Sequence, residues 1–185
     1  MAVKSSFKNM TLCLLAICLV CSSLLAGVYA LTKEPIAAAE QAKNDAAIKE
    51  VLPSDAVVIE AEAEKDGYKY NVARNQEGKV AGYAIDVAPV GFGGPIKMKV
   101  GFNADGLVWN VKVLSHAETP GLGAKCTEPA FSAQFQELDP KSGTLKVTKD
   151  GGSINAITAS TITSRAYVSG VEEAVAVYHK IKVEE

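Results

Sequence analysis

An uncharged and mostly apolar stretch near the start, residues 11–31, constrains this chain more than any other feature of its sequence. It reads TLCLLAICLVCSSLLAGVYAL, and 21 residues of α-helix at about 1.5 Å per residue reach about 30 Å, the thickness of a hydrocarbon core. Lys4 and Lys8 precede it, and no acidic residue occurs before Glu34. The positive-inside rule therefore predicts a single-pass helix with a cytoplasmic N-terminus and the remainder of the chain outside.

A cleaved signal peptide is the alternative interpretation of this segment. The residues YAL at its end vaguely resemble a cleavage site with small residues. The apolar run is, however, longer than the roughly 7–15 residues of a signal-peptide core, which favours a retained anchor. The three cysteines inside the run, Cys13, Cys18 and Cys21, are expected to act as small apolar residues of a membrane helix.

Composition narrows the class of the remaining sequence. The chain has 185 residues and a formal charge of −2, so it fits one domain and offers no broad basic face for nucleic acid. Cys126 is the one cysteine after the anchor, so no disulfide can form within that part, and we expect an inert thiol. His116 and His179 lie far apart without metal-ligand spacing around them, so we expect no dedicated zinc site.

Short alternating or β-branched runs follow the anchor, separated by turn signals such as Asp105-Gly106. They predict a mostly antiparallel sheet, half exposed, with strands at 56–62, 68–74, 79–87, 96–102 and 107–114. A further strand, TLKVTK, is expected at 144–149, and a short helix is expected within 115–135. The predicted fold class is α+β: a mostly antiparallel sheet with flanking helices, preceded by one N-terminal transmembrane helix.

This pattern divides the chain into four segments. They are a cytoplasmic N-terminus at 1–10, a transmembrane helix at 11–31, a juxtamembrane helix or linker at 32–54, and a folded domain at 55–185.

Five hydroxyl side chains crowd the seven positions of TASTITS, residues 158–164. An apolar helical face follows at steps of three and four, formed by Val168, Val171, Val175, Tyr178 and Ile181. Thr163 or Ser164 is therefore expected to cap the start of this helix. A helix N-terminus also attracts anions, so an anion site is the second interpretation of the hydroxyl cluster. Neither a Walker A loop nor GxGxxG occurs, so common nucleotide hydrolysis and dinucleotide binding have no support.

The same cluster resembles the flavin attachment region of the FMN-binding domain family. That family includes the G subunit of the Rnf electron-transport complex and the C subunit of the sodium-pumping NADH:quinone reductase. Its Ser/Thr-Gly-Ala-Thr signature carries FMN as a phosphodiester on the last threonine. Here the segment reads Thr158-Ala159-Ser160-Thr161 and then Ile162-Thr163-Ser164. The resemblance implies that Thr161 is the acceptor and that the cofactor-binding residues around it are Thr158, Ala159, Ser160, Thr163 and Ser164.

Three residues depart from the family's pattern. Ala159 replaces the usual glycine, Ser160 replaces the usual alanine, and Asn155 stands where an aspartate is common. An alanine would clash at this site if the backbone required a positive φ. Covalent loading of Thr161 is still expected.

Two further motifs carry the resemblance, HAETPGLG at 116–123 and GFGGPI at 91–96. The resemblance implies that the first motif borders the flavin, with Thr119 and Leu122 as ring contacts. Its other expected binding residues are Glu118, Gly121 and, nearby, Lys125. Taken by themselves, the glycines of the second motif indicate a structural turn before a strand, and we expect Trp109 to lie in the core and His116 to be a packed side chain.

The resemblance also implies a function. The chain is expected to be a flavoprotein subunit of an Rnf-type, ion-translocating ferredoxin:NAD⁺ oxidoreductase, carrying electrons on covalent FMN (a phosphothreonine linkage) and not catalytic alone. Its expected partners are the other membrane and peripheral subunits of a redox-driven ion pump, and a flavin transferase for maturation. The expected location is the bacterial cytoplasmic (inner) membrane, with the flavin domain on the outer or periplasmic side.

Three alternatives stay open. The chain could serve as the C subunit of the Na⁺-translocating NADH:quinone reductase, or as a free-standing surface flavoprotein. A different class is an anchored binding module without redox chemistry, in which the hydroxyl cluster only caps a helix.

Overall fold

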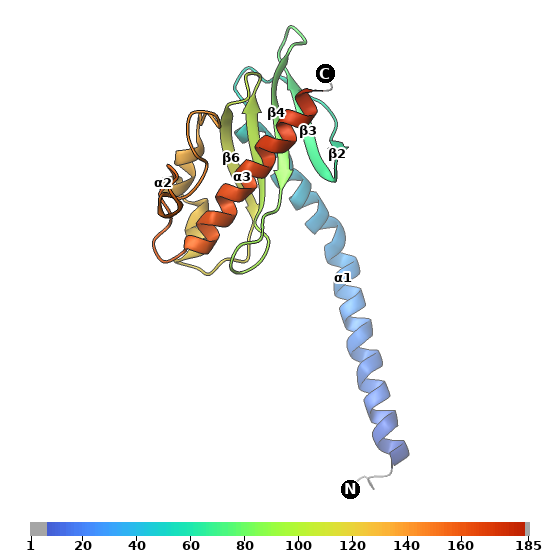
Figure 1. Cartoon of the computed structure of the whole chain (residues 1–185). Helices are drawn as coiled ribbons and strands as arrows, with labels where there is room; N and C mark the ends of the chain where they lie inside the picture. The colour runs from blue at the N-terminus through green and yellow to red at the C-terminus, as the bar shows by residue number, and fades with distance from the viewer. Residues whose placement is uncertain (1–6, 184–185) are drawn as a thin grey trace. The chain divides into compact units, whose positions relative to one another are not determined.

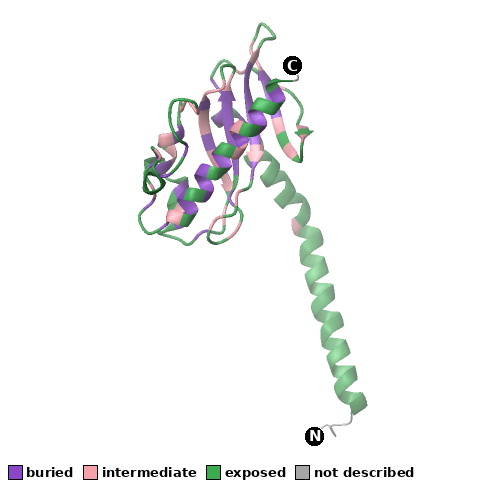
Figure 2. Ribbon diagram, viewed as in Figure 1, coloured by how far each residue is buried: buried purple, intermediate pink, exposed green. Residues whose placement is uncertain are grey.

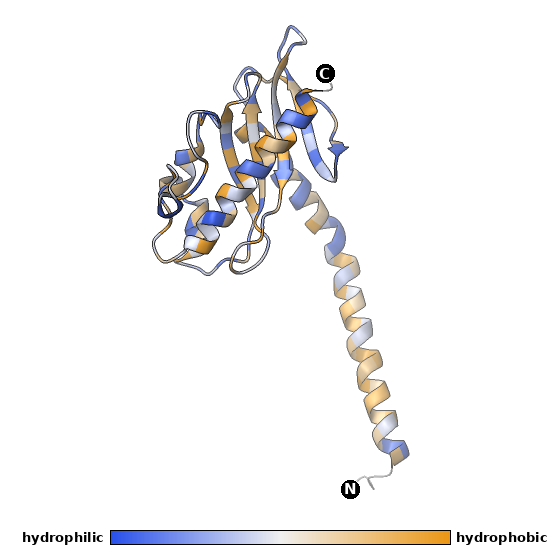
Figure 3. Cartoon of the chain, in the orientation of Figure 1, coloured by the Kyte–Doolittle hydropathy of each residue, from blue (hydrophilic) through white to orange (hydrophobic). Residues whose placement is uncertain are grey.

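The structure, a computed structural model, describes residues 7–183 of the chain. The chain divides into two compact units, Met1–Lys43 and Asn44–Glu185. The first is helical, because helix α1 (Phe7–Val51) begins there and contains the whole apolar stretch, coloured orange in Figure 3. By length and composition α1 is the one helix among the described residues that fits a membrane span. The single transmembrane helix expected from the sequence thus has a structural candidate.

Helix α1 runs without a break past residues 31 and 32, where the sequence suggested separate segments. Pro35 lies inside the helix, where it removes one backbone hydrogen bond but does not end the helix. Residues 1–6 of the expected cytoplasmic segment lie outside the described residues, and Phe7–Met10 already belong to α1. The four-segment division stays a prediction.

The second unit is built on one antiparallel sheet, which confirms the predicted fold class (Figure 1). Its strand order is β1-β3-β4-β5-β6, with β2 pairing beside β1 on β3. The strands are β1 (Val58–Ile59), β2 (Ala63–Lys65), β3 (Tyr68–Arg74), β4 (Val80–Val87), β5 (Lys97–Asn103) and β6 (Val108–Ser115). The last four match the predicted strands to within one residue at each end, whereas the predicted strand 56–62 is reduced to β1 and β2 was not predicted.

Helix α3 (Thr161–Lys182) covers one face of this sheet (Figures 1 and 2). Its buried side chains pack on the inward-facing residues of the strands, and the ring of Tyr178 stacks on that of Phe102 with centroids 5.0 Å apart. Four of the five residues of the predicted apolar face are buried, and Val175 is half-buried. Each aromatic or branched side chain buried here stabilises the fold by about 1.5–3 kcal/mol.

The opposite face of β4 and β5 is not exposed, contrary to the sequence expectation. The last turn of α1 packs there, with Ile48 and Val51 on Ala73 and Ala84. The backbones of α1 and β5 approach so closely here that only glycine fits at position 101, since a β-carbon at Gly101 would lie 1.8 Å from the Val51 carbonyl oxygen. Because the residues on this face are small, the sequence pattern of these strands resembled that of half-exposed strands. In the fold, the small residues make room for the last turn of α1.

The segment between β6 and α3 holds four short helices instead of further strands. They are η1 (Gly123–Thr127), α2 (Pro129–Ser132), η2 (Ala133–Phe135) and η3 (Thr148–Asp150). The strand predicted at 144–149 was wrong: Val147 and Ile154 form only an isolated bridge, because the chain turns at Gly151, whose φ is +82°. Trp109 is half-buried and lines a surface cavity together with Glu137, so the expectation that it lies in the core was wrong.

Candidate functional site

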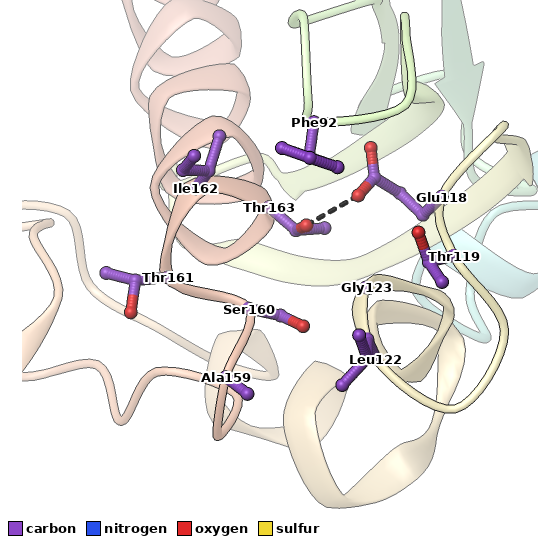
Figure 4. A pocket seen from close by; sticks show the side chains of 10 residues that line it. All are labelled: Phe92, Glu118, Thr119, Leu122, Gly123, Ala159, Ser160, Thr161, Ile162 and Thr163. Carbon is purple, nitrogen blue, oxygen red and sulfur yellow. Dashed lines mark hydrogen bonds between the residues drawn. The ribbon is translucent and has the colours of Figure 1, made fainter.

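Three segments far apart in the sequence meet around one cavity of about 380 Å³ at the start of α3 (Figure 4). Each of the three motifs singled out in the sequence contributes to its wall. The lining residues are Phe92, Glu118, Thr119, Leu122, Gly123, Ala159, Ser160, Thr161, Ile162 and Thr163. The fold therefore brings the three motifs together at a single site.

Helix α3 begins at Thr161 with Ser160 as N-cap, two residues earlier than the sequence indicated. Within the described residues, no side chain caps its first turn, so the expectation that Thr163 or Ser164 is the cap was wrong. Ser164 is buried and closes the preceding loop instead. Its hydroxyl donates to the Ser160 carbonyl and accepts from the Ile157 N–H, both at 2.9 Å. The first N–H groups of α3 thus lack a side-chain cap, and a helix N-terminus of this kind favours anions.

The backbone at Ala159 has a left-handed conformation, with φ of +61°. This is the condition under which an alanine is strained and a glycine is not. The loop before α3 therefore keeps the glycine-type geometry although its sequence has lost the glycine.

A buried carboxylate joins the walls of the cavity. Glu118 Oε2 accepts a hydrogen bond of 2.6 Å from the Thr163 hydroxyl, and Oε1 accepts one of 2.9 Å from the Gly93 N–H. The Glu118 N–H donates to His116 Nδ1 at 3.2 Å, so the histidine braces the same loop. One side chain thus connects the 91–96 loop, the 116–123 loop and the first turn of α3.

Glycine is required next to this carboxylate. A β-carbon would lie 2.3 Å from Glu118 Oε1 if added at Gly91, and 2.4 Å from Glu118 Oε2 if added at Gly123. Both distances are far below van der Waals contact, so the glycines of two motifs serve the same packing arrangement.

Comparisons with known proteins agree with this site. Residues 91–176 match the family model of the FMN-binding domain, and residues 1–51 match that of the RnfG N-terminal region. The chain is 36% identical to the G subunit of the proton-translocating ferredoxin:NAD(+) oxidoreductase complex of Clostridium ljungdahlii, over 91% of this chain and 87% of that protein. The chain belongs to the G-subunit family of ion-translocating oxidoreductase complexes.

A second relative in the G-subunit family comes from the ion-translocating oxidoreductase complex of Methanosarcina acetivorans. It is 37% identical over 84% of this chain and 88% of its own length. The fold is also that of a solved structure, the C subunit of the Na(+)-translocating NADH-quinone reductase from Parabacteroides distasonis. That match has a TM-score of 0.50 and 21% identity, and it covers 75% of this chain and 82% of the other.

The binding residues expected from the sequence are only partly assembled in this member of the G-subunit family. Seven line the cavity: Glu118, Thr119, Leu122, Ala159, Ser160, Thr161 and Thr163. Thr158 and Lys125 instead line a neighbouring cavity of about 350 Å³, on the side of Asn155. Gly121 is an exposed turn residue with φ of +75°, and Ser164 is buried in the loop closure described above.

Sequence reasoning missed three lining residues, Phe92, Gly123 and Ile162. Phe92 is 71% exposed and was assigned with its glycine-rich loop to a structural turn. The sequence did offer a signal for Phe92: a tight glycine turn does not need a large aromatic side chain, so its presence there could have indicated a binding role. Leu122 and Ile162, 43% and 54% exposed, add to the apolar part of the wall.

Thr161 lies on the side of the cavity opposite Glu118 and Thr119 (Figure 4). Its hydroxyl oxygen accepts a hydrogen bond of 3.2 Å from Lys149 Nζ. The oxygen that the family resemblance singles out therefore has a cationic neighbour from outside the three motifs.

Cys126 follows the 116–123 loop and is fully buried. Burial, and secondarily the negative charge of Glu118, raises the pKa of its thiol to about 11. The thiol is therefore protonated at neutral pH, which agrees with the expectation of an inert cysteine.

Proposed function

We propose that this chain carries electrons one at a time on FMN as the membrane-anchored flavoprotein subunit of an Rnf-type, ion-translocating ferredoxin:NAD⁺ oxidoreductase. The single observation that carries the proposal is the convergence of the three motifs on one cavity at the start of α3. Membership of the G-subunit family and the FMN-binding domain match support it. The chain acts with the other subunits of the complex and is not catalytic alone.

The cavity fits the two chemically different ends of FMN. The uncapped N-terminus of α3 and the Lys149 ammonium favour a phosphate group. Phe92, Leu122 and Ile162 offer exposed apolar surface suited to an aromatic ring system. When bound, FMN supplies one-electron redox chemistry, and the residues of this chain hold and orient it.

In this proposal Thr161 bears the phosphate as a phosphodiester. In this step Thr161 Oγ1 would bond to the phosphorus of a flavin nucleotide donor. The Oγ1–H bond and the bond between phosphorus and its leaving group would break, and the proton would leave with that group. A flavin transferase performs this step. The chain then gains the mass of FMN less one water.

The remaining residues have supporting roles in the proposal. The residues that contact the ring would be Thr119, Leu122 and Phe92. The hydrogen bond between Glu118 and Thr163 would hold the cavity wall in place. Ser160 faces the cavity beside the phosphate end. The residues that shape or flank the attachment loop are Thr158, Ala159, Ser164, Gly121 and Lys125.

We further propose the membrane arrangement that the sequence predicts. Residues 1–10 lie in the cytoplasm, 11–31 span the cytoplasmic membrane, 32–54 link, and 55–185 form the FMN-binding domain on the outer or periplasmic side. The candidate membrane helix α1 and the basic residues before its apolar stretch support this arrangement.

The test is covalent flavin content. The full chain is produced together with its flavin transferase, solubilised in detergent, and measured by intact mass and by in-gel flavin fluorescence after denaturation. We expect the FMN adduct in the wild type and in the control Thr144→Ala, an exposed threonine outside the three motifs, and its loss in Thr161→Ala. A fluorescent Thr161→Ala band would place the linkage elsewhere, and a flavin-free wild type would favour the non-redox binding module.

A further inference from the structure

Lys149 lies outside all three motifs, yet its side chain reaches the oxygen assigned as the flavin attachment point. The Nζ atom donates to Thr161 Oγ1 at 3.2 Å, between residues 12 positions apart. In the described part of the chain, no salt bridge joins Lys149 to a carboxylate, and the neighbouring Asp150 is paired with Arg165. Its charge is thus directed at a neutral hydroxyl group.

The segment that carries Lys149 is held in place on both sides. The Thr148 N–H donates to the Ile154 carbonyl at 2.8 Å, and the Ile154 N–H donates to the Lys146 carbonyl at 3.1 Å. Asp150 is bound by the Arg165 guanidinium through two hydrogen bonds of 2.7 Å. This pair ties η3 to the second turn of α3, and it neutralises the carboxylate next to Lys149.

The charges around Thr161 are consequently positive in sum. The N-terminal end of α3 contributes a partial positive charge, and Lys149 contributes a full one. The carboxylate of Asp150 is paired with the Arg165 guanidinium, and the carboxylate of Glu118 lies on the opposite side of the cavity. These positive charges favour a negatively charged group attached to the Thr161 oxygen.

We propose that Lys149 is the counter-ion of the phosphodiester that Thr161 bears, and that it also positions the Thr161 hydroxyl for attachment. The inference rests on the proposed function. The ammonium group already reaches Oγ1. It could therefore reach an oxygen of a phosphate attached to Oγ1 without a rearrangement of the chain. Asp150 and Arg165 are positioning residues, because they act through the loop that carries Lys149.

The test compares three variants of the full chain, loaded by its flavin transferase in detergent. Lys149→Met keeps an unbranched stem but removes the charge, Lys149→Arg keeps the charge, and Lys146→Met removes an exposed charge of the same loop that does not contact Thr161. The readouts are the initial rate of FMN attachment by intact mass, the ³¹P NMR signal of the loaded protein, and its circular dichroism.

We expect Lys149→Met to lower the attachment rate about tenfold, the size of one lost charge-assisted hydrogen bond. Its ³¹P signal shifts, while Lys149→Arg and Lys146→Met remain near the wild type.

The outcomes separate this inference from the proposed function. A loaded wild type together with unchanged ³¹P signal and attachment rate in Lys149→Met overturns the role of Lys149 alone. A wild type that never acquires FMN overturns both. If Lys149→Met loses its native circular dichroism, Lys149→Gln decides: an unchanged attachment rate and ³¹P signal in that variant overturn the inference, and a slower attachment with a shifted ³¹P signal supports it.

Discussion

The hydroxyl group of Thr163 donates a hydrogen bond of 2.6 Å to the carboxylate of Glu118, a residue 45 positions earlier in the chain. Both side chains are buried, and Glu118 also accepts from the Gly93 N–H. The contact joins the first turn of α3 to the 116–123 loop, and the same carboxylate binds the 91–96 loop. The shape of the cavity thus depends on one carboxylate.

Replacement of Glu118 should therefore destabilise the fold and the site together. Glu118→Ala leaves the buried Thr163 hydroxyl and the part-buried Gly93 N–H without their acceptor, and we expect the free energy of unfolding to fall by about 3 kcal/mol. Glu118→Gln retains one acceptor oxygen and should cost about 1 kcal/mol. Urea unfolding in detergent, followed by circular dichroism, measures both. The exposed Glu128→Ala is the control, and an equal loss in that variant would contradict the assigned role.

Gly123→Ala should disturb the site without removing any polar group. The added methyl group would lie 2.4 Å from Glu118 Oε2 and 2.7 Å from Thr163 Oγ1, so the hydrogen bond between them must break or shift. We expect a loss of about 2 kcal/mol in stability and a lower FMN content. Gly143→Ala is the matched control, because its β-carbon meets nothing closer than Ser153 Oγ at 3.7 Å. Normal FMN content in Gly123→Ala would show that the cavity tolerates the shift.

Ala159→Gly should stabilise the chain. The left-handed backbone at Ala159, with φ of +61°, costs an alanine about 1 kcal/mol relative to glycine. The midpoint of thermal or urea unfolding should rise accordingly, and flavin attachment should be as fast as in the wild type or faster. Ala133→Gly is the opposite control, since Ala133 is right-handed with φ of −61° and should lose stability. A destabilised Ala159→Gly would refute the conformational explanation.

Cys126 should be unreactive in the folded chain and should make stability depend on alkaline pH. Its thiol pKa is raised from 9.0 to about 11, chiefly by burial. The folded state therefore favours the protonated thiol. The stability that this preference contributes is fully present below pH 9.0 and is lost as the pH rises through about 11.

The measurement uses a chain in which Cys13, Cys18 and Cys21 are replaced by serine, so that Cys126 is the one thiol left. At pH 8 we expect alkylation to be at least about tenfold slower in the folded than in the urea-unfolded chain. Cys126→Ala should unfold with a smaller pH dependence between pH 9 and 11 than the parent chain. Equal alkylation rates before and after unfolding would argue against burial of this thiol.

The sequence predicted the fold where short-range pattern and packing agree. Strands β3 to β6 were found because each alternates or is β-branched and ends at a turn signal. The run at 144–149 has the same composition, but the turn at Gly151 leaves it without a strand partner. Strand pairing depends on residues distant in the chain, which a local pattern does not contain.

The site was predicted by motif and not by geometry. The motifs named the loop at 116–123 and the hydroxyl cluster, and the fold brings them together. The sequence did not reveal that Glu118 is shared by three segments, or that Lys149 reaches Thr161. Both contacts join residues of different loops, so they become visible only when the chain is folded.

The last turn of α1 also limits how a soluble fragment can be prepared. Ile48, Val51 and Leu52 form a second small core with Ala73 and Ala84. A fragment that begins after Leu52 would leave these alanines and Gly101 open to water and prone to self-association. A cut near Asn44, at the boundary between the two compact units, removes the apolar stretch. It preserves the last turn of α1, which covers this face of the sheet.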